Sequence, residues 1–312
     1  MIMDRNILNE LKKMISSDRI FTDAKMSDYT SFKIGGCADV LVNPETPEEL
    51  SSLIGFAKKN RLPYYVIGNG TNLLVSDSGY RGMIILIKDR KPEIVFETAD
   101  SPEYCTVGVS AGCSLAKLST EAAAKGLTGL EFASGIPGSV GGAVVMNAGA
   151  YGGEIKDVLE FADVMDENGT LIRLTKEECD FGYRRSVIQH KNYIVLYASF
   201  LLKKGDMGKI KSEMRELNER RREKQPLELP SAGSTFKRPE GFFAGKLIED
   251  AGLRGYRVGD AMVSEKHCGF VVNVGKASAD DVYTLISDVI SKVYEHSGVV
   301  LEPEVKLLGF DE

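Results

Sequence analysis

The spacing of apolar residues along the chain predicts a series of amphipathic helices. In the stretch 278–296, apolar residues recur every three or four positions, which places them on one face of a helix. The segment after residue 45 carries helix-start signals, because Thr46 is a good N-cap, Pro47 suits the first helical position and Glu49 completes a capping box. Helices are expected at 4–16, from 47 onward, and at 114–125, 206–224, 244–251 and 278–296.

Shorter apolar runs between these helices predict strands. They lie at 38–42, 64–67, 83–87, 104–109, 161–166, 170–174, 193–202, 269–274 and 299–308. The tripeptide Glu167-Asn168-Gly169 between two of these runs is typical of a hairpin turn. A second capping-box pattern, from Thr175 to Glu178, follows that hairpin.

The order of these elements indicates a mixed α+β fold. The chain shows no internal repeat and no low-complexity segment. A charged helix at 206–224 leads into a segment that contains Pro226 and Pro230, which is typical of a linker. A domain boundary is therefore expected near residues 205–230.

Length and charge narrow the possible functions. At 312 residues, the chain is long enough for two or three packed subdomains. Its formal net charge of -6 argues against broad binding to nucleic acid or to an anionic membrane, because both need a basic surface. A small basic pocket for a phosphorylated ligand remains compatible with that charge. We expect a cytoplasmic protein without a membrane span, because the sequence contains no secretory signal pattern and no run of 18 apolar residues.

The cysteines and histidines do not form a recognisable metal or disulfide pattern. The five cysteines are scattered and include no C-x-x-C pair, which fits a reducing compartment. The three histidines lie far apart in the sequence, and no H-E-x-x-H motif is present. We therefore expect no structural metal site.

Two glycine-rich segments, 65–74 and 134–153, are the strongest candidates for a ligand site. Glycine allows backbone N–H groups to converge on an anion, and neighbouring Thr and Asn side chains add neutral donors. Together the segments are expected to hold a diphosphate. The first is not a dinucleotide fingerprint, because Leu73 stands at the last glycine position, and neither segment is a Walker A loop. Ordinary tight turns are the alternative interpretation of each segment taken alone.

Seven segments, in order along nearly the whole chain, strongly resemble the UDP-N-acetylenolpyruvoylglucosamine reductases. They are residues 29–36 (YTSFKIGG), 68–72 (GNGTN), 135–142 (GIPGSVGG), 181–186 (FGYRRS), 232–237 (AGSTFK), 264–270 (SEKHCGF) and 301–305 (LEPEV). The family also has a longer class, with an insertion that carries a substrate-gripping tyrosine. Arg184 and Ser234 are only 50 positions apart, so the chain resembles the compact class that lacks this insertion.

The resemblance implies the FAD-binding fold of the vanillyl-alcohol-oxidase type, with two α+β subdomains and a C-terminal α+β substrate domain. On this basis, we expect a first FAD-binding subdomain at 1–80 with 303–312, a second at 81–205, and the substrate domain at 206–302. The cofactor-binding residues expected from the glycine segments are Ile67, Gly68, Asn69, Gly70, Thr71, Asn72, Gly135, Ile136, Pro137, Gly138, Ser139, Val140, Gly142, Asn147 and Gly149. The FAD is expected to be non-covalent, because neither segment contains a histidine.

The implied activity is an NADPH-dependent reduction of UDP-N-acetylglucosamine enolpyruvate to UDP-N-acetylmuramate, a step of peptidoglycan biosynthesis. Ser234 matches the proton donor of the family, and Arg184 and Glu304 match the two other active-site residues. A planar guanidinium at Arg184 suits the enolpyruvyl carboxylate and the enolate charge. Glu304 is expected to orient that carboxylate or a proton relay. Taken alone, without its motif, Ser234 is typical of a loop or N-cap serine, and Arg184 and Glu304 are typical of surface ion pairs.

The remaining expectations concern the substrate and the alternatives. Candidates for contacts to the substrate are Tyr151, Lys224, Lys237 and Arg238. His267 is expected to pack within its own turn rather than to act in acid–base chemistry. We expect a monomer or a weak homo-oligomer. Two rival hypotheses are a sugar or alcohol oxidase of the same flavin fold and a non-catalytic nucleotide-binding regulator.

Overall fold

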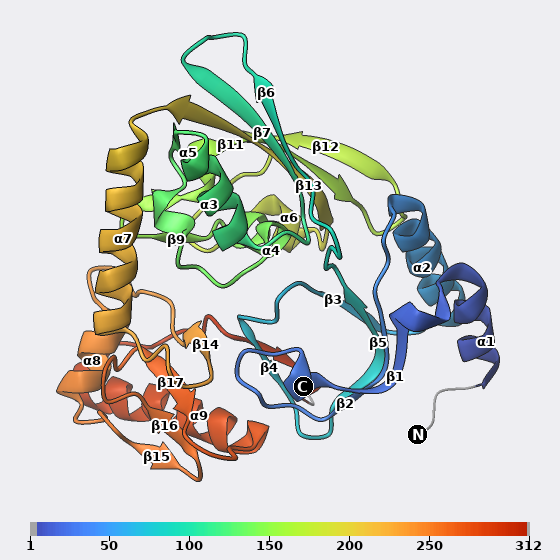
Figure 1. The fold of residues 1–312 in the computed structure, drawn as a ribbon. Helices are drawn as coiled ribbons and strands as arrows, with labels where there is room; N and C mark the ends of the chain where they lie inside the picture. Colours follow the sequence, from blue (N-terminus) through green and yellow to red (C-terminus); the bar gives the residue numbers. More distant parts are fainter. Residues whose placement is uncertain (1–4, 311–312) are drawn as a thin grey trace. The chain divides into compact units, whose positions relative to one another are not determined.

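The computed structural model describes residues 5–310, and the chain divides into two compact units. The first contains residues 1–21, 41–69 and 83–220, and the second contains residues 22–40, 70–82 and 221–312. Figure 1 shows the course of the chain. The three-part division expected from the sequence stays a prediction. In the described part of the chain, no helix combines the length and the apolar character needed to cross a bilayer.

The first unit is built around an antiparallel sheet in the order β12-β11-β13-β7-β6, with β8 also paired to β13. These strands are β6 (Ile94–Thr98), β7 (Tyr104–Ser110), β8 (Leu127–Thr128), β11 (Leu159–Met165), β12 (Leu171–Thr175) and β13 (Ile194–Lys204). Helices α3 (Leu115–Ala124) and α4 (Val140–Val145) cover one face of the sheet (Figure 1). The core between the two layers contains Val107, Leu118, Val140 and Phe200, all fully buried. Burial of such apolar side chains stabilises this unit.

Short elements complete the first unit around this core. They are α1 (Arg5–Met14), α2 (Pro47–Asn60), β3 (Tyr64–Ile67), β9 (Gly149–Ala150), β10 (Gly153–Glu154), α5 (Ile155–Val158) and α6 (Val187–His190). Strand β3 pairs in parallel with β5 (Tyr80–Leu86), in a sheet whose order is β1-β2-β5-β3. Strands β1 (Ile20–Lys25), β2 (Cys37–Val42) and β5 each run from one unit into the other along the chain.

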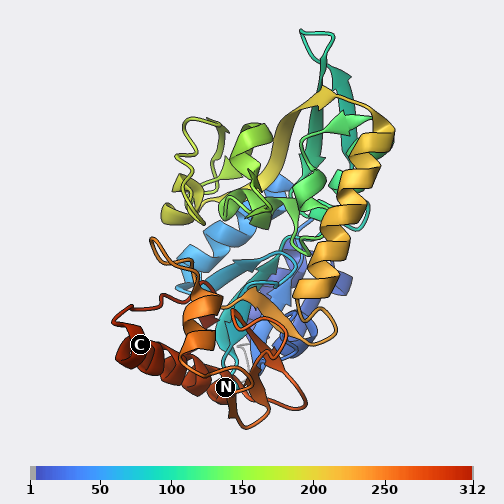
Figure 2. The same ribbon diagram turned by 90° about the vertical axis from the view of Figure 1, so that its left-hand side faces the viewer.

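The second unit is a smaller α+β assembly. Its sheet has the order β14-β17-β16-β15, and β18 pairs in parallel with β4. The strands are β4 (Leu73–Val75), β14 (Ser231–Ser234), β15 (Arg257–Val258), β16 (Ala261–Val263), β17 (Phe270–Asn273) and β18 (Lys306–Leu308), and the helices are α8 (Ala244–Asp250) and α9 (Ala279–Ser297). The apolar stripe of α9 is buried against this unit, as its spacing predicts. Helix α7 (Met207–Lys224), gold in Figure 2, is one uninterrupted helix that leads from the first unit into the second.

Among the described residues, the local signals predicted the longer helices and half of the strands, but they missed many of the short elements. The six expected helices are confirmed, although the first was expected from residue 4, which lies outside the described residues. The capping box of Thr175 and Glu178 forms both of its hydrogen bonds, yet no helix follows it. The expected strand at 299–308 is wrong over most of its length, since only Lys306–Leu308 is a strand. Pro303 lies inside that stretch and Val300 is 66% exposed, so neither hydrogen bonds nor burial favour a longer strand.

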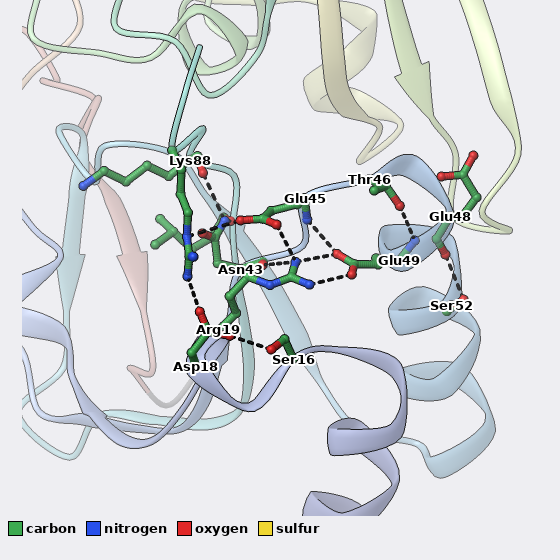
Figure 3. Close-up of polar contacts among 12 residues, drawn as sticks. Ser16, Asp18, Arg19, Asn43, Glu45, Thr46, Glu48, Glu49, Ser52 and Lys88 are labelled. Atoms are coloured by element: carbon green, nitrogen blue, oxygen red, sulfur yellow. Dashed lines mark hydrogen bonds and ion pairs between the residues drawn. The ribbon is translucent and has the colours of Figure 1, made fainter.

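A buried arginine joins the N-terminal segment to the start of α2. The Arg19 side chain is 9% exposed, and its two terminal nitrogens each lie 2.6 Å from a carboxylate oxygen of Glu49 (Figure 3). Arg19 also donates to the carbonyl of Asn43. Thr46 caps α2 as predicted. The carboxylate of Glu49, however, accepts a hydrogen bond from the N–H of Glu45, and not from that of Thr46 as a capping box requires. The carboxylate of Glu49 thus binds Arg19, which lies 30 residues away in the sequence.

We expect Arg19→Met to lower the free energy of unfolding by about 3 kcal/mol, because it leaves a mostly buried carboxylate without its cation. Hydrogen bonds from Arg19 lower the pKa of Glu49, although burial opposes this shift. Since the folded-state pKa is the lower one, the carboxylate stabilises the fold above the unfolded-state pKa, and this contribution disappears as pH falls through the folded-state pKa. Urea unfolding from neutral to acidic pH should therefore show the gap between wild type and variant closing in acid.

The matched control is Arg90→Met, which removes another arginine that forms ion pairs, in this case with Asp18 and Glu45. Arg90 is paired with Asp18 at 2.8 Å, but both side chains are more than half exposed. Water screens such a pair, so this variant should unfold almost like the wild type. Equal losses in the two variants would contradict the role of burial.

Candidate active site

The two glycine-rich segments meet in the first unit. The side-chain amide of Asn69 donates to the carbonyl of Pro137 at 2.9 Å. A Cβ atom at Gly68 would lie 2.3 Å from the hydroxyl oxygen of Ser139, so a larger residue at position 68 would displace this hydroxyl. Segments that are about 70 residues apart in the sequence are thus adjacent, which a shared ligand requires.

The end of the first segment is a turn with available backbone donors. Gly70 has a φ of +61°, and a Cβ there would lie 2.0 Å from the carbonyl oxygen of Tyr29. Within residues 5–310, the N–H groups of Asn69, Gly70 and Thr71 find no acceptor in the chain. Successive N–H groups in such a turn form a concave anion site, so these residues fit the diphosphate of FAD.

The second glycine segment is divided between buried and accessible residues. Ser139 is 3% exposed and accepts a hydrogen bond from the N–H of Gly142, while Val140 is fully buried and donates to the carbonyl of Cys113. Pro137 and Gly142 are exposed. The exposed residues of this segment therefore lie in its turn and in α4, and the cofactor-binding roles of its residues stay a prediction.

Arg184 is held in a defined orientation in the first unit. One of its terminal nitrogens donates to the carbonyl of Gly149 at 3.0 Å, and its guanidinium lies 5.1 Å from the centre of the Tyr183 ring. Its neighbour Arg185 is exposed and pairs with Asp180 at 3.4 Å. The geometry therefore favours Arg184 over Arg185 as the arginine of the site.

Tyr151 lies on the turn between β9 and β10, next to an open hollow in the first unit. Its side chain is 45% exposed, and its φ is +53°. The hollow has a volume of about 630 Å³ and is lined by Tyr151 and by residues of α7, namely Lys209, Ser212, Glu213, Glu216, Leu217 and Arg220. An exposed aromatic ring beside such a space is available for contact with a ligand.

The backbone brings Ser234 and Glu304 close together in the second unit. Ser234 is the exposed last residue of β14, opposite Phe270 of β17. The next residue, Thr235, accepts a hydrogen bond from the N–H of Glu304 at 2.8 Å. Asn72 donates its side-chain amide to the carbonyl of Glu304, so the end of the first glycine segment is adjacent as well. Three predicted site residues are thus placed together by long-range backbone pairing.

The predicted substrate cations differ in their surroundings. Lys224 is exposed at the end of α7. Lys237 forms an ion pair with Glu302, and Arg238 lies 4.0 Å above the ring of Phe243. Because Glu302 already compensates the charge of Lys237, an additional anion at Lys237 has to share or replace this ion pair.

His267 packs within its own turn, as predicted. Its Nδ1 accepts from the N–H of Gly269 at 3.1 Å, and its ring makes an edge contact with Phe270. Burial lowers the pKa of His267, so the neutral form is favoured. A neutral, packed ring has a structural role in this turn.

The chain is similar over nearly its whole length to curated proteins named UDP-N-acetylenolpyruvoylglucosamine reductase. It is 53% identical to the protein of this name from Lachnoclostridium phytofermentans, over 98% of both chains. It is 52% identical to the one from Agathobacter rectalis, over 98% of this chain and 99% of the other. Residues 225–308 match the C-terminal domain of that reductase family, and residues 38–175 match an FAD binding domain.

Solved structures agree with this similarity. The crystal structure of the UDP-N-acetylenolpyruvylglucosamine reductase from Thermus caldophilus is 38% identical, with a TM-score of 0.74 over 93% of this chain and 98% of that chain. An alkyldihydroxyacetonephosphate synthase is 16% identical, with a TM-score of 0.50 over 64% of this chain and 41% of that chain, and this likeness concerns the fold alone. The expected α+β fold with an FAD-binding domain of the vanillyl-alcohol-oxidase type is confirmed.

Proposed function

The chain belongs to the UDP-N-acetylenolpyruvoylglucosamine reductase family, and from this membership we propose that it reduces UDP-N-acetylglucosamine enolpyruvate to UDP-N-acetylmuramate with electrons from NADPH. It is then an FAD-containing oxidoreductase of peptidoglycan biosynthesis, a process on which cell-wall formation, cell shape and division depend. The observation that carries the proposal is the 53% identity to a curated reductase over 98% of the chain. The matched part of the chain includes an FAD binding domain. The active protein is expected in the cytoplasm, as a monomer or weak homo-oligomer.

The cofactor and the protein have separate tasks in this reaction. Bound FAD supplies the hydride chemistry, from NADPH to the terminal vinyl carbon of the enolpyruvyl group. The donors of the turn at 69–71 are proposed to bind the diphosphate of FAD, because their N–H groups are available. The protein otherwise binds the sugar nucleotide, excludes water and handles one proton.

The proton and the developing charge are assigned to three side chains. Hydride addition at the vinyl carbon places negative charge on the carbon next to the carboxylate and, as an enolate, on the carboxylate itself. Arg184 binds that carboxylate and stabilises the added charge. The hydroxyl of Ser234 gives its proton to the carbanionic carbon, and Glu304, which is hydrogen bonded to Thr235 through its own N–H, orients the carboxylate or the proton relay.

The nucleotide part of the substrate is assigned to cationic and aromatic side chains. Lys224, Lys237 and Arg238 are the proposed partners of its diphosphate, and exposed Tyr151 is a proposed contact with the bound sugar nucleotide. The ion pair of Lys237 with Glu302 then has to open or to be shared when the diphosphate binds.

The absorption spectrum of the purified protein, followed without oxygen, tests the proposal. The chain has no tryptophan, so bound flavin should dominate the spectrum above the protein band. We expect a yellow protein that NADPH bleaches and that recovers its colour when the enolpyruvyl sugar nucleotide is added. Colour recovery with oxygen and peroxide instead would favour an oxidase. A colourless protein that FAD does not reconstitute would favour a nucleotide-binding regulator.

A further inference from the structure

Strained backbone is concentrated around Arg184. Asn147, Tyr151 and Arg184 have φ angles of +43°, +53° and +53°, in the left-handed region that L-residues avoid. The structure links these residues, because Arg184 donates to Gly149, which lies between the other two. Such conformations persist where surrounding contacts over-determine them, and they are frequent at active sites. The contacts that hold Arg184 in this conformation are therefore of functional interest.

Asn147 is the centre of these contacts. It is fully buried, and its side-chain amide donates to the carboxylate of Glu154 and to the carbonyl of Gly182, each at 3.0 Å. Its side-chain oxygen accepts from the N–H of Lys156 at 2.9 Å. Gly182 begins the turn that contains Arg184 and closes on Arg185. Asn147 was expected to bind the cofactor, but its side chain is engaged within the protein.

Glu154 contacts both Asn147 and the β9–β10 hairpin. Its register partner in the β9–β10 hairpin is Gly149, the residue whose carbonyl accepts from Arg184. Its carboxylate is 23% exposed and lies 2.6 Å from the ammonium of Lys156. Burial raises the pKa of Glu154, but hydrogen bonds from Lys156 and Asn147 and the charges of Lys156 and Arg184 outweigh it and lower the pKa. Glu154 is thus ionised, and Arg184 lies within the reach of its charge.

We propose that Asn147 and Glu154 are positioning residues for Arg184. Asn147 fixes the turn at Gly182, Glu154 fixes the hairpin that presents the carbonyl of Gly149, and the guanidinium is held between these two supports. This inference rests on the proposed function, in which Arg184 binds the enolpyruvyl carboxylate. A misplaced guanidinium weakens the contact with the carboxylate but not the contacts with the nucleotide.

The test is the variant Asn147→Asp, alone and combined with Glu154→Gln. The single variant keeps the size of residue 147 and its acceptor, but it loses both donated bonds and places two carboxylates together. The double variant restores a carboxylate–amide pair with donor and acceptor exchanged. Asn192→Asp is the matched control, because Asn192 is exposed and has the same left-handed backbone, with a φ of +53°.

Binding to the oxidised holoenzyme is measured by calorimetry with two ligands. For UDP-N-acetylglucosamine enolpyruvate, Asn147→Asp should raise the Kd on the order of 10-fold. The double variant should recover part of this loss, because it restores the contact between residues 147 and 154 but not the bond donated to Gly182. For UDP-N-acetylglucosamine, which lacks the carboxylate, the Kd should stay within about twofold of wild type, a difference of about 0.4 kcal/mol. Asn192→Asp should behave like the wild type in the binding of both ligands and in flavin reduction by NADPH.

Three results would overturn the proposal. They are an unchanged Kd for the enolpyruvyl ligand, equal losses for both ligands, and a loss that Glu154→Gln does not relieve. Glu154→Gln alone provides a second measurement if Asn147→Asp does not fold. This variant removes the charge of residue 154 and retains an oxygen that accepts from Asn147. An unchanged Kd for the enolpyruvyl ligand in this variant would then contradict the positioning role. Failure of the proposed function would look different, since the wild type itself would neither bind the enolpyruvyl ligand nor regain colour with it after reduction.

Discussion

Ser234→Ala should retain FAD and be bleached by NADPH at the wild-type rate, but its flavin should be reoxidised by the enolpyruvyl substrate about 10³-fold more slowly. The serine hydroxyl is a weak acid, yet the carbon that receives the proton is a strong base at that moment, so the transfer is not steeply uphill. Loss of a positioned proton donor typically costs 10²-fold to 10⁴-fold. Rapid mixing with NADPH, and then with substrate, separates the two half-reactions.

The location of Ser234 indicates that Ser234→Ala will slow the proton transfer without disturbing the fold. Ser234 is exposed at the end of β14, and the adjacent backbone is fixed by the bond from the N–H of Thr235 to the carbonyl of Gly269. Removal of the hydroxyl therefore leaves the strand intact. Ser231→Ala, in the same strand, is the control, and it should react like the wild type. Normal reoxidation of Ser234→Ala would exclude Ser234 as the proton donor.

Local signals in the sequence predicted the helices well, because caps and apolar stripes act over a few residues. Thr46 caps α2, and the apolar stripe of α9 is buried, both as expected. The capping box at Thr175 shows the limit of such signals. Its hydrogen bonds form, but Asp180 adopts a φ of +43° soon after, and the chain turns instead of continuing as a helix. The short strand β14 was missed because its pairing with β17 is a tertiary contact.

Motifs in the sequence identify candidate site residues, but they do not reveal the contacts among those residues. The bond between Asn69 and Pro137 and the pairing of Thr235 with Glu304 join residues 68 and 69 positions apart, which no local pattern encodes. The hydrogen bonds of Asn147 within the protein could not be predicted either, since the sequence does not distinguish a buried amide from a ligand-binding amide. Glu154 was missed entirely, because a single carboxylate after two glycines carries no signal until the fold places it beside Asn147.

Arg184→Lys is the substitution with the second-largest expected effect, about a 10²-fold loss in the rate of flavin reoxidation by substrate. Lysine keeps the charge but loses the planar fork that matches a carboxylate, and it loses the geometry of the bond to Gly149. Removal of a donor that stabilises a developing oxyanion costs 10²-fold to 10³-fold. Since the enolate charge is absent from the bound substrate and develops in the transition state, the limiting rate should fall more than the affinity for substrate.

Arg185→Lys is the matched control for this prediction. Arg185 carries the same side chain one position later, but it is exposed and pairs only loosely with Asp180. We therefore expect Arg185→Lys to react like the wild type in both half-reactions. The reverse pattern, a slow Arg185→Lys and a normal Arg184→Lys, would show that the motif has been read one residue out of register. In that case, the reacting guanidinium would be that of Arg185. The contacts of Asn147, Gly149 and Glu154 would then stabilise only the turn that contains Arg184.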